Sequence, residues 1–274
     1  MKIAFFGTPT FAQIVLEKLI ASQYKPELVI TAHDAKAGRG RQIKSSPVKQ
    51  SAEKNNIEVI TPTNLKDVNN LDFELAILVA YGKILPQNIL DIPKYGFINV
   101  HPSLLPKYRG PSPIQSAILN GERTTGVSIM LLDQEVDHGP VLSQKEIEIE
   151  KSDTHDSLAQ KLANVGADLL LETLPPYLDG SQKPKEQTHQ EATVTEHITK
   201  QDGYFDIENP PKKEDLDRMI RAYFRWPTAW TKIHGRVVKF LPEGKIQPEG
   251  KKPMKLKEFL NGYQQFKDQI EKLF

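Results

Sequence analysis

Short apolar runs alternate with amphipathic stretches through the first half of the chain, and this alternation restricts the fold more than any other feature. The strand-like runs lie at residues 2–6, 28–31, 58–60, 76–80 and 97–100, and the helical stretches lie at 10–21, 47–55 and 112–119. The run Leu75-Ala76-Ile77-Leu78-Val79-Ala80 is apolar without interruption, which is typical of a strand buried on both faces. We therefore expect an α/β fold, with a mostly parallel sheet and helices on both of its faces.

Later segments extend this pattern and then break it. Strand-like residues 127–132 and 141–149 precede a long helical stretch over about 154–174, which we expect to close the first domain. After Asp179-Gly180 the chain becomes polar without apolar periodicity, as linkers do. We predict a Rossmann-like catalytic domain over residues 1–180, a linker over 181–199 and a C-terminal domain over 200–274.

Composition excludes several classes of protein. The chain has no cysteine, which excludes disulfides, thiolate catalysis and cysteine-ligated metals. Its histidines show no repeated metal-ligand spacing, so we expect no metal. No apolar stretch is long enough to span a bilayer and no export signal is present, so we expect a water-soluble, cytoplasmic, monomeric protein without a membrane partner.

The net charge of +1 conceals an uneven distribution. Residues 210–274 hold 15 Lys and Arg against 8 Asp and Glu, whereas residues 1–209 hold 21 against 27. A concentrated positive segment suggests a polyanionic partner, because phosphates attract Lys and Arg over long distances. The alternative is a solvated, lysine-rich tail.

An amide, an imidazole and a carboxylate form the candidate catalytic set. Asn99 and His101 lie two residues apart at the end of one predicted strand, so they share a face where open α/β sheets bind ligands. Their N–H groups can stabilise the oxyanion of a tetrahedral intermediate. Asp137 can orient the imidazole or take a proton from an attacking amine, so the set suits acyl transfer to an amine. The alternative is a pair of strand-end polar groups satisfied by their neighbours.

Two longer motifs carry a family resemblance. NVHPSLLPKYRGPSPIQ at 99–115, with GVSIMLLDQEVDHGPVL at 126–142, resembles the signature of folate-dependent formyltransferases. The resemblance implies that Asn99, His101 and Asp137 are catalytic and that 10-formyltetrahydrofolate is the formyl donor. It implies a folate site near residues 81–86 and 133–137, formed largely by backbone groups. The cofactor-binding candidates are Tyr81, Ile84, Leu85, Ser103, Leu104, Leu105, Pro106 and Asp133.

The acceptor is indicated by other segments. The flexible loop expected at 34–49 has five basic residues and one acid, and its AGRG and SPVK elements resemble the inserted loop of methionyl-tRNA formyltransferases. That resemblance implies that Arg39 contacts the first base pair of initiator tRNA. RAYFRWPTAW at 221–230 is similar to the segment that begins the family's C-terminal domain, and we interpret Trp226 and Trp230 as packing residues. The tRNA-binding candidates are Lys36, Arg39, Arg41, Lys44, Lys49, Arg221, Arg236, Lys251 and Lys252.

The C-terminal domain departs from the family pattern, because few residues separate Phe240 from Gly250. We expect a shortened OB-like β domain capped by a helix over 256–274. The resemblance as a whole implies transfer of a formyl group from 10-formyltetrahydrofolate to the α-amino group of methionyl-initiator tRNA. The alternatives are a sugar-nucleotide N-formyltransferase and a non-catalytic RNA-binding relative.

Overall fold

The computed structural model describes residues 1–37, 42–68, 71–271 and 273, and the chain forms two compact units. Unit 1 contains Met1–Gly110, Thr125–Ile147 and Ala159–Val194. Unit 2 contains Pro111–Thr124, Glu148–Leu158 and Thr195–Phe274. Each unit thus collects separate stretches of chain, and the functional division predicted at residues 180 and 199 stays a prediction.

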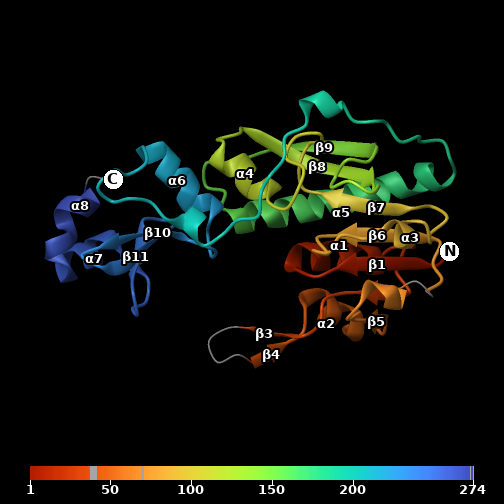
Figure 1. Cartoon of the computed structure of the whole chain (residues 1–274), viewed down its shortest axis with the longest axis horizontal. Helices are drawn as coiled ribbons and strands as arrows, with labels where there is room; N and C mark the ends of the chain where they lie inside the picture. Colours follow the sequence, from red (N-terminus) through yellow and green to blue (C-terminus); the bar gives the residue numbers. More distant parts are fainter. Residues whose placement is uncertain (38–41, 69–70, 272, 274) are drawn as a thin grey trace. The chain divides into compact units, whose positions relative to one another are not determined.

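A seven-stranded sheet forms the centre of unit 1 (Figure 1), with strand order β5-β2-β1-β6-β7-β8-β9. The strands are β1 (Ile3–Gly7), β2 (Leu28–Ile30), β5 (Glu58–Ile60), β6 (Leu75–Val79), β7 (Phe97–His101), β8 (Thr124–Leu131) and β9 (Val141–Glu148). The first five strands in this order pair in parallel, and β8 pairs antiparallel with β7. The predicted mostly parallel α/β fold is confirmed.

Helices accompany this sheet, as the sequence pattern predicts. They are α1 (Thr10–Ile20), α2 (Pro47–Lys54), α3 (Gln87–Leu90), α5 (His155–Leu178) and the 3-10 helices η1 (Leu65–Val68) and η2 (His189–Glu191). Ser46 begins α2 by accepting a hydrogen bond from the Lys49 N–H, and Pro47 occupies the first helical turn, where its missing N–H costs nothing. The buried residues Leu158, Leu162 and Leu170 lie along α5 at helical spacing.

The β3–β4 hairpin corrects the expectation of a flexible loop at 34–49. β3 (Ala35–Ala37) and β4 (Gln42–Lys44) pair antiparallel, with Ala35 opposite Lys44. Main-chain pairing between the two strands therefore gives residues 35–37 and 42–44 regular structure.

Unit 2 contains a four-stranded antiparallel sheet in the order β10-β11-β12-β13 (Figure 1). Its elements are α4 (Pro113–Leu119), η3 (Gln201–Gly203), α6 (Lys213–Ala222), β10 (Ala229–Ile233), β11 (Arg236–Leu241), β12 (Lys245–Pro248), β13 (Met254–Lys255), α7 (Leu256–Gly262), η4 (Gln264–Phe266) and α8 (Lys267–Glu271). His234 and Gly235 both have positive φ, as the turn of a two-residue hairpin requires, and they join β10 to β11. The predicted small C-terminal β domain is present.

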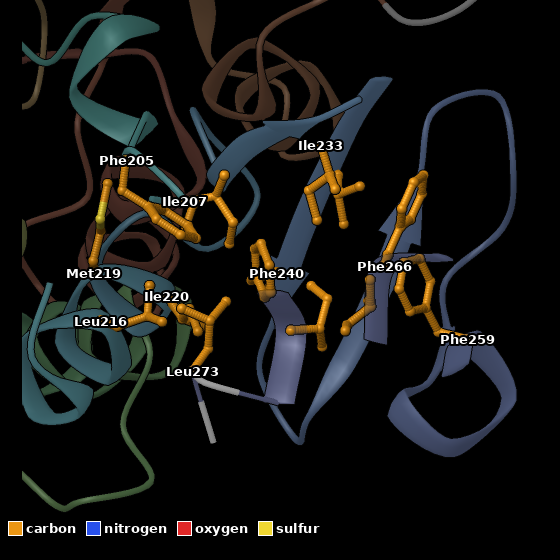
Figure 2. Packing of buried hydrophobic residues seen from close by; sticks show 14 of the residues in the cluster. Phe205, Ile207, Leu216, Met219, Ile220, Ile233, Phe240, Phe259, Phe266 and Leu273 are labelled. Atoms are coloured by element: carbon orange, nitrogen blue, oxygen red, sulfur yellow. The ribbon is translucent and has the colours of Figure 1, made fainter. Parts of the chain in front are cut away.

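One apolar cluster holds unit 2 together (Figure 2). Leu216 and Ile220 of α6, Phe240 of β11, and Phe259 and Phe266 near the C-terminus are buried members of this cluster. Removing such side chains from water is the main favourable contribution to folding. These contacts join elements that are distant in the sequence.

The expected single helix over 256–274 is wrong. Its first part ends at Tyr263, whose φ of −138° and ψ of 54° are not helical, and a 3-10 turn precedes α8. The Tyr263 ring stacks on Phe259 at 4.8 Å and on Phe266 at 5.7 Å between centroids. Aromatic packing therefore fixes a bend that helical periodicity does not reveal. Within the described ranges, no helix has both the length and the apolar character needed to cross a membrane.

Candidate active site

Three polar side chains meet beyond the end of β7. Asn99 and His101 are 5% and 4% exposed, and Asp137 lies in the turn after β8. The Asn99 amide donates from Nδ2 to Asp137 Oδ1 at 3.2 Å, and His101 Nδ1 lies 3.5 Å from Asp137 Oδ2. The structure thus brings together the three residues that the sequence selects as the catalytic set.

Two backbone groups complete this cluster. The Gly110 N–H donates to Asp137 Oδ2 at 2.8 Å, and the Tyr108 carbonyl lies 3.0 Å from His101 Nε2. A carbonyl can only accept, so His101 carries a proton on Nε2 and turns Nδ1 toward the carboxylate. Sequence reasoning missed the contributions of Tyr108 and Gly110, because backbone groups have no residue-type signature.

Backbone conformation places these groups. Tyr108 and Asp137 have φ values of 60° and 50°, in the left-handed region that L-residues seldom adopt. Such conformations persist only when surrounding contacts hold them, and they cluster at functional sites.

The arrangement provides both donors and a proton acceptor. The amide nitrogen of Asn99 carries a second N–H, and a proton on His101 Nδ1 would make the ring a second donor beside it. The Asp137 carboxylate offsets the positive charge of such an imidazolium. The cluster can therefore stabilise a developing oxyanion and accept a proton from an attacking amine.

The predicted folate residues at 81–85 differ in exposure. Tyr81 and Leu85 are buried in one apolar cluster, whereas the Ile84 side chain is 76% exposed. Burial raises the pKa of the Tyr81 phenol to about 12. Ile84 is thus the residue of this group whose side chain offers accessible apolar surface.

The other predicted folate residues form the turn after β7 and the start of the 133–137 loop. Ser103 Oγ donates to the Lys107 carbonyl at 2.6 Å, and the Leu105 N–H donates to Ser128 Oγ at 3.0 Å. Leu104 and Pro106 are half-buried. Asp133 accepts a hydrogen bond from His138 Nδ1 at 2.7 Å and another from the Glu135 N–H at 2.9 Å.

The basic residues predicted in the N-terminal half are placed differently from one another. Lys36 lies in β3, and Lys44 is exposed at the end of β4. Lys49 forms an ion pair with Asp34 at 3.0 Å. Arg39 and Arg41 lie outside the described residues.

In unit 2 the candidates divide into paired and exposed side chains. Arg221 pairs with Asp217 at 2.8 Å and donates to the Asp153 carbonyl at 3.0 Å, which gives it a structural role. Arg236, Lys251 and Lys252 are exposed.

The two tryptophans do not share one environment. Trp230 is buried and donates from Nε1 to the Lys200 carbonyl at 3.1 Å, as the packing interpretation expects. Trp226 is 58% exposed, so that interpretation is wrong for it. Trp226 lies between Arg225 and Thr228, which have φ values of 70° and 72°.

Metal-ligating side chains do not gather in the described part of the chain. Among residues 1–37, 42–68, 71–271 and 273, no group of three or more His, Cys, Asp or Glu is arranged to hold a metal ion.

Comparison with known sequences gives close relatives over most of the chain. The methionyl-tRNA formyltransferase of Thermodesulfovibrio yellowstonii is 40% identical over 296 aligned residues, which cover 95% of each chain. That of Roseiflexus castenholzii is 41% identical over 248 residues, covering 88% of this chain and 79% of the relative.

Solved structures share the fold at lower identity. A 4-N formyltransferase from Francisella tularensis has a TM-score of 0.69 and 19% identity, covering 88% of this chain and 96% of that one. An N-formyltransferase from Helicobacter canadensis, in complex with folinic acid and dTDP-3-aminofucose, has a TM-score of 0.64 and 20% identity, covering 90% and 94%. At these identities the likeness shows the fold alone.

The formyl transferase family profile matches residues 1–174, which include the Asn99, His101 and Asp137 cluster. The chain therefore belongs to the formyl transferase family, and its relatives place it among the methionyl-tRNA formyltransferases.

Proposed function

We propose that this protein transfers the formyl group of 10-formyltetrahydrofolate to the α-amino group of methionyl-initiator tRNA, giving N-formylmethionyl-tRNA for translation initiation. The observation that carries the chemistry is the convergence of Asn99, His101 and Asp137 at the end of β7. This acceptor is supported by the name of a relative, a methionyl-tRNA formyltransferase that is 40% identical over 95% of both chains.

The proposed mechanism is addition followed by elimination. His101 Nδ1, oriented by the Asp137 carboxylate, takes the proton of the amine as the new C–N bond forms and the formyl oxygen becomes an oxyanion. Asn99 and the His101 Nδ1–H donate to that oxyanion, and each such donor is worth about 2.7–4 kcal/mol in the transition state. His101 then returns the proton to the departing folate nitrogen as its bond to the formyl carbon breaks.

The folate supplies a formyl group that is already bonded to a nitrogen leaving group. The site offers an accessible apolar side chain at Ile84 and polar backbone in the turns at 103–106 and 133–137. The folate contains a flat heterocycle with several hydrogen-bonding atoms. Sites for such ligands combine an apolar wall with a few convergent polar groups. We assign folate contact to Ile84, Leu104, Pro106 and the backbone of residues 133–137. The buried residues Tyr81, Leu85, Ser103 and Leu105 support these contacts from the protein interior.

The exposed basic residues are assigned to the tRNA. Lys44 of unit 1 and Arg236, Lys251 and Lys252 of unit 2 are exposed and so accessible to phosphates. We assign Lys36, Arg39 and Arg41 to tRNA binding as well. Lys49 and Arg221 already pair with carboxylates, so their part in tRNA binding is smaller.

A transfer assay with labelled 10-formyltetrahydrofolate and a panel of amine acceptors tests this proposal. The panel contains methionyl-initiator tRNA, uncharged tRNA as a control and an amino-sugar nucleotide. We expect label on the charged tRNA alone. Label on the amino sugar alone would show that the acceptor is an amino sugar and not methionyl-tRNA. Salt-sensitive tRNA binding without any product would indicate a non-catalytic RNA-binding protein.

A further inference from the structure

The segment 187–194, which the sequence predicts as part of a linker, packs against the turn after β7. The Arg109 N–H donates to the Thr193 carbonyl at 2.9 Å, and the Tyr108 N–H donates to Thr193 Oγ1 at 2.8 Å. Val194 forms a parallel bridge with Arg109. This turn presents the Tyr108 carbonyl to His101 and the Gly110 N–H to Asp137, so the segment supports the site from outside.

The Gln187 side chain joins two turns of the site. It is 8% exposed. Its Nε2 donates to the carbonyls of Asp137 at 2.9 Å and Gly139 at 2.7 Å. Its Oε1 accepts from Arg109 Nη2 at 2.7 Å and Nε at 3.2 Å. Carbonyls only accept and a guanidinium only donates, so chemistry fixes which way the amide faces.

The Arg109 guanidinium is buried and is also held by a second residue. Arg109 Nη2 lies 2.9 Å from His189 Nδ1, which must be the acceptor because the guanidinium has no lone pair to offer. The His189 ring stacks on that of His138, with 4.0 Å between centroids, and His138 donates to Asp133. Residues 187 and 189 therefore fix Arg109 beside Gly110, whose N–H binds the Asp137 carboxylate.

We propose that Gln187 is a positioning residue for the formyl transfer assigned above, and this inference rests on that proposed function. Gln187 holds the main chain of Asp137 in its left-handed conformation from one side and the Arg109–Gly110 turn from the other. One amide thereby sets the separation between Gly110 N and the Asp137 carboxylate. Removing its N–H donors releases the 137–139 turn, while removing its oxygen takes away one of the two side-chain acceptors that hold the Arg109 guanidinium.

Two substitutions separate the effect of the Gln187 N–H donors from that of its oxygen. Gln187→Ala removes the donors to the carbonyls of Asp137 and Gly139 and one acceptor of the Arg109 guanidinium, which keeps His189 as a partner, and the lost bonds to the two carbonyls also destabilise the fold. Gln187→Glu keeps an acceptor for Arg109, with an added ionic attraction, but presents no donor to the carbonyls of Asp137 and Gly139. A purely structural role would lower the thermal midpoint of Gln187→Glu, because its carboxylate cannot donate to the two carbonyls, but would leave kcat of the folded protein close to wild type. A positioning role lowers kcat as well.

Gln182→Ala is the matched control. Gln182 is another glutamine of the linker predicted over 181–199, and its side chain donates to the Leu142 carbonyl. We expect Gln187→Glu to lower the thermal midpoint and, at temperatures where the variant is folded, to lower kcat about 100-fold, as a displacement near 1 Å does, with KM for both substrates close to wild type. Gln182→Ala should keep wild-type kcat.

The crystal structure of the Gln187→Glu protein supplies a readout independent of the substrate. We expect the Asp137 carboxylate to have moved away from Gly110 N. Wild-type kcat in Gln187→Glu, or an unmoved carboxylate, would overturn the inference. If the wild-type protein formylates no acceptor, the proposed function fails, and the position of Asp137 in the variant still decides whether Gln187 holds it.

Discussion

The Tyr81 hydroxyl is a buried polar group that finds no hydrogen-bond partner among the described residues. The ring packs edge-on against Phe6 with 5.5 Å between centroids, and the side chain has almost no contact with solvent. Burying a hydroxyl unpaired costs about 1–3 kcal/mol, and Phe fills the same space without it. We predict that Tyr81→Phe raises the free energy of unfolding by about 1 kcal/mol and the thermal midpoint by about 2–4 °C.

The effect of Tyr81→Phe should grow at alkaline pH. Burial raises the pKa of Tyr81 from 10.0 to about 12, so between these values the unfolded chain loses the phenolic proton while the folded protein keeps it. The unfolded state then binds fewer protons, and stability falls as pH rises through this window. The variant lacks this loss, so its advantage over wild type should be larger at pH 11 than at pH 7.5.

Urea unfolding at both pH values measures this difference, with Tyr177→Phe as the control. Tyr177 Oη donates to the Tyr95 carbonyl at 2.8 Å, so losing that hydroxyl should destabilise the protein by about 1 kcal/mol. Equal destabilisation by Tyr81→Phe and Tyr177→Phe would refute the reasoning. A raised KM for the folate in Tyr81→Phe would instead assign the phenol to folate contact, whereas we expect that KM to stay unchanged.

Three further outcomes follow from packing and charge. Trp230→Ala should lower the free energy of unfolding by about 3–5 kcal/mol, whereas Trp226→Ala should lower it by less than about 0.5 kcal/mol. Thermal denaturation measures both, and equal losses would contradict the different burial of the two side chains. Arg221→Ala should lower the thermal midpoint, because it removes an ion pair and a bond to a carbonyl, and an unchanged midpoint would contradict its structural role. Replacing Lys251 and Lys252 by Ala should weaken tRNA binding and reduce its salt dependence in filter binding without changing stability. If the slope of binding affinity against salt concentration equalled that of wild type, the two lysines would not contact the tRNA phosphates.

The strands of the seven-stranded sheet in unit 1 could be predicted from their apolar sequence pattern, whereas β3 and β4 were expected to be a loop. The uninterrupted apolar run at 75–80 is stable only where both faces are covered, and β6 lies between β1 and β7. The long helix α5 followed from leucines at helical spacing. Boundaries moved by one to four residues, because the ends of elements depend on capping and tertiary contacts.

The parts that could not be predicted depend on distant contacts. The helix expected over 256–274 bends at Tyr263, where the rings of Phe259, Tyr263 and Phe266 pack against one another. The polar segment at 187–194 has no periodicity, yet Gln187 is buried because its amide matches two carbonyls and a guanidinium from elsewhere in the chain. No local pattern contains those partners.

For the active site, spacing placed Asn99 and His101 on one face of a strand, the chemistry of amine attack selected Asp137, and the family resemblance implied the same three residues. The structure brings the carboxylate within 3.2 Å of the amide and 3.5 Å of the imidazole. The Tyr108 carbonyl and the Gly110 N–H were invisible in the sequence, because every residue carries such groups and only the fold selects which ones bind.

Single-turnover transfer of labelled formyl from 10-formyltetrahydrofolate to methionyl-initiator tRNA, by the Asn99→Ala and Asp137→Ala proteins, tests the central claim most directly. The claim is that one cluster at the end of β7 surrounds the reacting formyl carbon. We predict that each variant slows the chemical step by about 100-fold or more while the thermal midpoint stays within a few degrees of wild type. Near-normal turnover by both variants would contradict the account.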